Sequence, residues 1–108
     1  MILYENLYIG ESLQHNKDRI IRRMKKGKVV VRLFCVTLPL GSHGLIEIYP
    51  YYELQQPWLK SQHVVVIGLA KTREEAFLLV QEIVEEVYEK TRGFEIAHYL
   101  ERKQGGAQ

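Results

Sequence analysis

The chain has 108 residues, enough for one domain with a modest hydrophobic core. Hydrophobic residues make up 46% and charged residues 26%, which are globular proportions and exclude a disordered chain. The formal net charge of +2 is too small to indicate nucleic-acid binding by itself. The longest apolar run, residues 64–70, is far shorter than the roughly 20 residues of a membrane-spanning helix, so we expect no membrane partner.

The first ten residues have no basic region of the kind that opens a secretory signal. A single cysteine, Cys35, excludes an internal disulfide and fits a reducing compartment, so we expect a cytoplasmic protein. Cys35 lies in an apolar run, which favours a buried, inert thiol over a nucleophile.

The first half of the chain predicts one helix and three strands. Residues 2–9 predict a strand with apolar side chains on both faces, and Ser12 to Lys26 predict a helix with a narrow apolar stripe. Gly27 suits the left-handed position after a helix. The nearly continuous apolar run Val29 to Leu38 predicts a central strand covered on both faces. After a glycine-rich loop, Leu45 to Tyr49 predict a short antiparallel strand.

The second half predicts a further strand and a long helix. One helical turn is expected after Pro50, and His63 to Ala70 read as an apolar strand. Thr72 and Glu75 form a capping box before a wide apolar face, which predicts a helix from Arg73 to Arg92 that ends at Gly93. Phe94 to Leu100 fit either a strand or a helix.

The predicted order is β-α-β-β-β-α-(β), typical of a two-layer α+β sandwich with a small mixed sheet and two main helices. We expect a single domain over residues 1–100 and a flexible C-terminal tail over 101–108. If helices cover only one face of strands that are apolar on both, a partner chain must bury the other face. The pattern therefore predicts a homodimer.

The first predicted helix and its end carry seven positive charges and one negative, Asp18. The basic residues are Lys17, Arg19, Arg22, Arg23, Lys25, Lys26 and Lys28. The second predicted helix is acidic, with six glutamates between Glu74 and Glu89. The two helices could pair within a chain or across a dimer interface. Alternatively, the basic helix contacts the phosphates of a nucleic acid, with Lys17, Arg19, Arg22, Arg23, Lys25 and Lys26 as candidate contacts.

Without its first strand, the order α-β-β-β-α resembles the double-stranded RNA-binding domain. That family has a loop with glycine and histidine between its first two strands, and residues 41–44 of this chain are Gly-Ser-His-Gly. The family also has a lysine cluster at the start of its last helix, where this chain has Glu74 and Glu75. Two glutamates would repel phosphates, so the family's function is not carried over.

A second candidate is the aromatic segment over residues 49–58. Its possible interface or ligand contacts are Tyr49, Tyr51, Tyr52 and Trp58, together with His43 from the glycine-flanked loop. Aromatic side chains in loops anchor interfaces, line pockets, or cap the edge of a small core. The four histidines and Cys35 have no metal-ligand spacing, and no phosphate-binding or nucleophile motif occurs. We therefore expect no catalytic residue, cofactor or metal.

Several stretches resemble small bacterial proteins of about a hundred residues without an assigned activity. They are Val66 to Lys71, Glu75 and Ala76, Glu85 to Tyr88, Tyr4 to Gly10 and Glu53 to Pro57. The resemblance implies a cytoplasmic bacterial protein. The function that the sequence favours is a small, non-enzymatic structural or interaction protein acting as a homodimer. The alternatives are a nucleic-acid-binding module that uses the basic residues 17–28, and a ligand or enzymatic pocket at residues 49–58.

Overall fold

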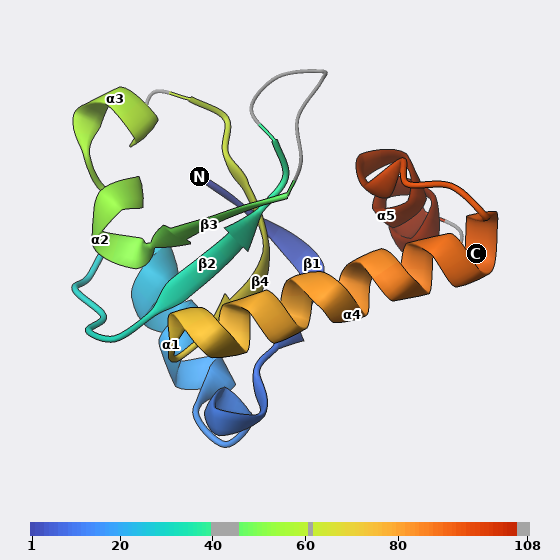
Figure 1. Cartoon of the computed structure of the whole chain (residues 1–108). Coiled ribbons are helices and arrows are strands. Elements are labelled where there is room, and N and C mark those ends of the chain that lie inside the picture. The colour runs from blue at the N-terminus through green and yellow to red at the C-terminus, as the bar shows by residue number, and fades with distance from the viewer. Residues whose placement is uncertain (40–45, 61, 106–108) are drawn as a thin grey trace.

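The structure is a computed structural model and describes residues 1–39, 46–60 and 62–105 (Figure 1). It contains a four-stranded sheet in the order β1-β4-β2-β3. The strands are β1 (Ile2–Ile9), β2 (Phe34–Thr37), β3 (Glu47–Pro50) and β4 (Val65–Ala70). β1 pairs with β4 in parallel, and the other two pairs are antiparallel. The predicted α+β class with a small mixed sheet is confirmed.

Five α-helices and one 3₁₀ turn surround the sheet in the described residues. They are η1 (Glu11–Leu13), α1 (Lys17–Lys25), α2 (Tyr51–Leu54), α3 (Pro57–Lys60), α4 (Arg73–Thr91) and α5 (Ile96–Gly105). The predicted turn after Pro50 is α2, and the predicted long helix is α4. The undecided segment after Phe94 is helical from Ile96, and α5 continues over 101–105, which the sequence assigned to the tail.

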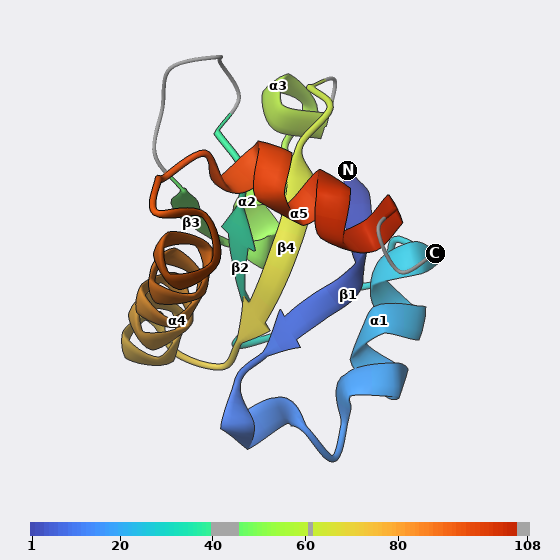
Figure 2. The same cartoon turned by 90° about the vertical axis from the view of Figure 1, so that its right-hand side faces the viewer.

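Helices cover both faces of the sheet, as the two views show (Figures 1 and 2). On one face, Ile20 and Met24 of α1 pack with Cys35 of β2, and the core continues into α2 and α3. On the other face, Ile83 and Val87 of α4 pack with β2 and β4, next to α5. The chain therefore forms three layers where two were predicted. The argument for a homodimer from a bare sheet face was wrong, because this chain buries both faces itself.

The run from Val29 to Leu33, predicted as the first half of a central strand, is not a strand. Val29 and Val31 are each 75% exposed, and only Phe34–Thr37 join the sheet. Arg32 adopts a left-handed conformation with φ 53°, which extended strand residues do not. The bend at Arg32 thus overrides the β-propensity of the valines and leaves this segment at the surface, beside α1.

The predicted helix from Ser12 to Lys26 is divided into η1 and α1. In the turn between the two helical pieces, the Asn16 amide donates to the Leu13 carbonyl at 3.0 Å. Leu13 is buried with Ile20 and Met24, so the apolar stripe was identified correctly although the helix is interrupted.

Candidate functional site

A basic hollow of about 740 Å³ lies between α1 and the segment after it. Its four cationic side chains are Arg19 and Arg23 of α1, Arg32 of the following segment and Lys71 at the end of β4. No carboxylate lines this hollow; its other lining residues are apolar or neutral. Three separate segments of the chain thus bring positive charge to one place, which favours an anionic ligand.

The end of α1 explains how this geometry is built. Gly27 has φ 68°, the Lys28 amide donates to the Arg23 carbonyl, and the Gly27 amide donates to the Met24 carbonyl. These two bonds form a Schellman motif, confirming the predicted role of Gly27. The guanidinium of Arg23 then donates to the Val29 carbonyl, with Nη2 at 2.8 Å. The helix and the exposed segment are therefore fixed against each other.

The remaining basic residues of α1 extend the positive charge beyond the hollow. Lys17, Arg22, Lys25 and Lys26 are exposed, and the structure shows no ion pair between them and any described residue. We call the whole set the basic surface: Lys17, Arg19, Arg22, Arg23, Lys25, Lys26, Lys28, Arg32 and Lys71. All six basic residues singled out from the sequence belong to it. Arg32 and Lys71 were missed, because only the fold brings them to α1.

Most of the acidic helix lies apart from the basic surface, although the charge of Lys71 acts on Glu75 at the start of α4 and helps to lower the pKa of Glu75. α4 packs on the sheet face opposite α1 (Figure 2). A second hollow, of about 710 Å³, lies between α4 and the end of β1, and it collects the opposite charge. Its carboxylates come from Glu11, Glu75, Glu82, Glu85, Glu86 and Glu89. Although the net charge of the chain is small, its positive charges gather around α1 and its negative charges gather along α4.

Glu75 has a structural role within this acidic region. Its backbone amide donates to the Thr72 hydroxyl at 3.1 Å, as a capping box requires. Its carboxylate accepts from the Lys71 amide at 2.7 Å and from the amide and hydroxyl of Ser12. Burial opposes ionisation, but these hydrogen bonds outweigh it and lower the pKa of Glu75. The α4 N-terminus and η1 are thereby joined.

The side chains of the aromatic segment lie in different surroundings. Tyr51 is buried in the core under α1, and the Tyr49 hydroxyl donates to Glu47. Tyr52 and Trp58 are exposed. None of the three hollows described in this section is lined by these four residues. His43 lies outside the described residues.

A polar cluster that the sequence did not indicate joins α5 to β1 and α4. The Glu86 carboxylate accepts from the hydroxyls of Tyr8 (2.9 Å) and Tyr99 (2.7 Å) and from the ammonium of Lys103 (2.9 Å). Burial and the bond to Glu86 raise the pKa of Tyr8 to about 12. Burial opposes ionisation of Glu86, but the three donors outweigh it and lower its pKa. Glu86 is therefore a carboxylate and Tyr8 a neutral phenol at neutral pH.

The Glu86 cluster fastens α5 and is not arranged for chemistry. Nearby, the Tyr4 hydroxyl donates to the Leu100 carbonyl at 3.1 Å, and the Leu100 side chain is buried. The hydrogen bond to Glu86 also raises the pKa of Lys103. A tightly paired ammonium and a high-pKa phenol are poor proton-transfer groups near neutral pH. The partners are up to 95 residues apart in the chain, so no local spacing could reveal the cluster.

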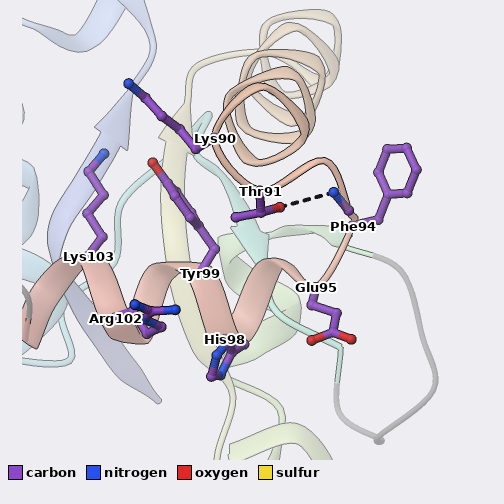
Figure 3. A pocket seen from close by; sticks show the side chains of 9 residues that line it. Lys90, Thr91, Phe94, Glu95, His98, Tyr99, Arg102 and Lys103 are labelled. Carbon is purple, nitrogen blue, oxygen red and sulfur yellow. Dashed lines mark hydrogen bonds between the residues drawn. The ribbon is translucent and has the colours of Figure 1, made fainter.

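A third hollow, of about 780 Å³, lies between the end of α4 and α5 (Figure 3). Lys90, Tyr99 and Lys103 point to one side of it, whereas His98 and Arg102 point to another. Lys103 is already paired with Glu86. Since the cationic groups do not meet at one point, this hollow is a weaker candidate for an anion than the basic hollow.

Neither thiol nor metal chemistry finds support in the described residues. Cys35 is fully buried, and burial raises its thiol pKa to about 12, so the thiol is protonated and inert. Within the described ranges, no three His, Cys, Asp or Glu residues come together as a metal site. No described helix combines the length and the apolar character needed to cross a membrane. The chain matches no protein-family model, no curated protein and no solved structure.

Proposed function

We propose that the protein is a non-enzymatic binding module whose basic surface contacts the phosphate backbone of a nucleic acid. The observation that carries the proposal is the basic hollow, where Arg19, Arg23, Arg32 and Lys71 gather without a carboxylate in its lining. Cationic side chains that have no carboxylate beside them can neutralise the phosphates of a nucleic acid. This releases the counterions of the nucleic acid and so favours binding.

The dimensions of the basic surface suit a nucleic acid. α1 has nine residues and is therefore about 13 Å long, at 1.5 Å per residue. A duplex carries one phosphate charge per 1.7 Å of its axis, so about eight phosphates fall within that length. Several cations of α1 can therefore contact phosphates at once. Such contacts carry no base information, and we expect binding with little sequence preference.

The proposal is tested by fluorescence anisotropy with a labelled 20-base-pair duplex and a single strand of the same length. The charge reversal Arg19→Glu with Lys26→Glu should weaken binding at least tenfold, because it removes one phosphate contact of the basic hollow, removes a neighbouring cation of the basic surface and adds two repulsions. The matched control is the double reversal Lys90→Glu with Arg102→Glu, which changes the same amount of charge at two exposed residues where α4 ends and α5 lies. Equal losses in the two variants, or binding to anionic lipid vesicles in place of nucleic acid, would contradict the proposal.

Homodimer formation is the second proposal, and it now rests on a different observation from the one in the sequence. Three large apolar side chains of α4 and the turn after it are exposed, namely Phe77, Tyr88 and Phe94, and the rings of Tyr88 and Phe94 stack. Exposed apolar clusters of this kind mark sites of protein association. Sedimentation velocity would detect the dimer. We also propose a cytoplasmic location, which the single, buried cysteine supports.

A further inference from the structure

The basic hollow is lined by apolar side chains as well as by cations. Val29 and Val31 are each 75% exposed, although valine is a residue that proteins usually bury. Both valines line the hollow together with Arg19 and Arg32. A phosphate backbone is charged and hydrated, so phosphate contacts alone leave these apolar surfaces in water. The ligand that fits the hollow therefore has an anionic part and an apolar part.

The two valines lie on a segment, residues 29–32, that is fixed at both ends. At its start, Nε and Nη2 of Arg23 donate to the Val29 carbonyl at 3.3 and 2.8 Å. Directly after it, Leu33 is buried, and its carbonyl accepts from the Tyr51 amide at 2.8 Å. The valines thus stand in place before a ligand arrives. A preorganised site of this kind loses little conformational entropy on binding.

The arginines of the hollow suit both parts of such a ligand. The Val29 carbonyl takes only one edge of the planar Arg23 guanidinium. The other edge, formed by Nη1 and Nη2, has the geometry that matches two oxygens of a phosphate. Arg19 and Arg32 bring two more guanidinium groups to the hollow. Guanidinium groups bind phosphates through their edges and stack on nucleic-acid bases through their faces.

An unpaired nucleotide has the two parts that the hollow requires. Its phosphate is anionic, and the faces of its base become available once the base leaves a stack. In a duplex, the bases are stacked on their neighbours and only their edges are open in the grooves. The hollow, of about 740 Å³, also falls within the range of pockets that hold small organic ligands, roughly 300–1,000 Å³.

We infer that the basic hollow holds one unpaired nucleotide of a single-stranded nucleic acid, with the base against Val29 and Val31 and the phosphate on the arginines. The inference rests on the proposed nucleic-acid function and specifies the form that binds best. The cations also contact the phosphates of a duplex, but a duplex offers the valines no base face. Phosphate contacts by themselves favour the duplex, which has the higher charge density. A preference for the single strand therefore reports on the bases.

The inference is tested by fluorescence anisotropy at 50 mM salt with three labelled probes. They are an oligothymidine of 20 nucleotides, a 20-base-pair duplex, and an abasic strand of 20 units that keeps the phosphates and sugars. The wild-type protein should bind the oligothymidine at least fivefold more tightly than either of the other probes.

Substitution of the valines locates this preference in the hollow. Val29→Ser and Val31→Ser should each weaken binding of the oligothymidine at least threefold and leave the affinity for the duplex unchanged. The matched control is Leu78→Ser, because Leu78 is 65% exposed but lines the hollow between α4 and the end of β1. This control should bind all three probes as the wild type does.

The outcomes separate this inference from the proposed function on which it rests. Equal affinities for the three probes, or tighter binding of the duplex, would overturn the nucleotide site and leave the proposed function standing. Equal effects of Val31→Ser and Leu78→Ser on oligothymidine binding would do the same, because the loss would not come from the hollow. No binding of any probe at 50 mM salt would overturn both.

Discussion

Replacing Glu86 by glutamine removes the charge that holds α5 to the rest of the protein. One carboxylate oxygen accepts from Tyr8, and the other accepts from both Tyr99 and Lys103. A glutamine has only one acceptor oxygen. If that oxygen accepts from Tyr8, then Tyr99 and Lys103 lose the acceptor that Glu86 gave them. Each lost bond costs about 1 kcal/mol net. The side chains of Glu86 and Lys103 are 25% and 41% exposed, which limits the electrostatic part of the loss.

Glu86→Gln should therefore lower the free energy of unfolding by about 1–2 kcal/mol. Urea denaturation at pH 7 measures this change, and Glu85→Gln is the control, since Glu85 is the exposed neighbour on α4. The control should stay within about 0.5 kcal/mol of the wild type. Equal stability of Glu86→Gln and the wild type would refute the structural role of the cluster.

We also expect the stability difference between the wild type and Glu86→Gln to depend on pH. The folded-state pKa of Glu86 lies below its ordinary value of 4.5, because the three donors favour the carboxylate. The stabilisation is therefore complete above about pH 4.5 and is lost as the pH falls through the folded-state pKa. The stability difference between wild type and Glu86→Gln should shrink in that acidic range. A difference that stays constant down to pH 3 would contradict this assignment.

Four further substitutions and one labelling experiment test other parts of the structure. Gly68→Ala places a Cβ 3.2 Å from the Tyr8 carbonyl oxygen and 3.3 Å from the Val36 Cβ. This crowding should lower the free energy of unfolding, measured in urea, by about 1–3 kcal/mol. Gly93→Ala is the control and should lower it less, because the nearest atom to the added Cβ is 3.7 Å away. Val31→Ser should change stability by less than about 0.5 kcal/mol; a larger loss would place Val31 in the core after all. Arg32→Gly should relieve the left-handed residue and raise or preserve stability while weakening duplex binding, so unchanged binding would remove Arg32 from the site. The Cys35 thiol should react with a thiol reagent only after unfolding, and rapid labelling of the native protein would show that it is accessible.

The parts of the fold that the sequence predicts well are those in which local signals agree. Thr72, Glu75 and the apolar periodicity together locate α4, and the structure places it within one residue of the expectation. Gly27 ends α1 because the left-handed position after a helix has a strong local preference for glycine. The antiparallel pairing of β2 with β3, expected because two apolar runs flank a glycine-rich loop, is confirmed.

The errors arise where distant contacts override local preference. Val29 and Val31 have the composition of a strand, but the sheet ends at Phe34 and leaves them exposed. The doubly apolar strands were read as evidence for a partner, yet helices of the same chain cover both faces. Sequence spacing could not place Lys71 beside α1 or Tyr8 beside Lys103, because those neighbours are set by the strand order.

The most direct test of the central claim is the affinity of the wild-type protein for a duplex as a function of salt. With four phosphate contacts, one for each cation of the basic hollow, the logarithm of the association constant should fall with a slope near −3.6 against the logarithm of salt concentration, at ~0.9 for each contact. The affinity should therefore decrease about a hundredfold between 50 and 200 mM salt. An absence of binding at 50 mM salt, or an affinity that does not change with salt, would contradict a phosphate-binding role for the basic surface.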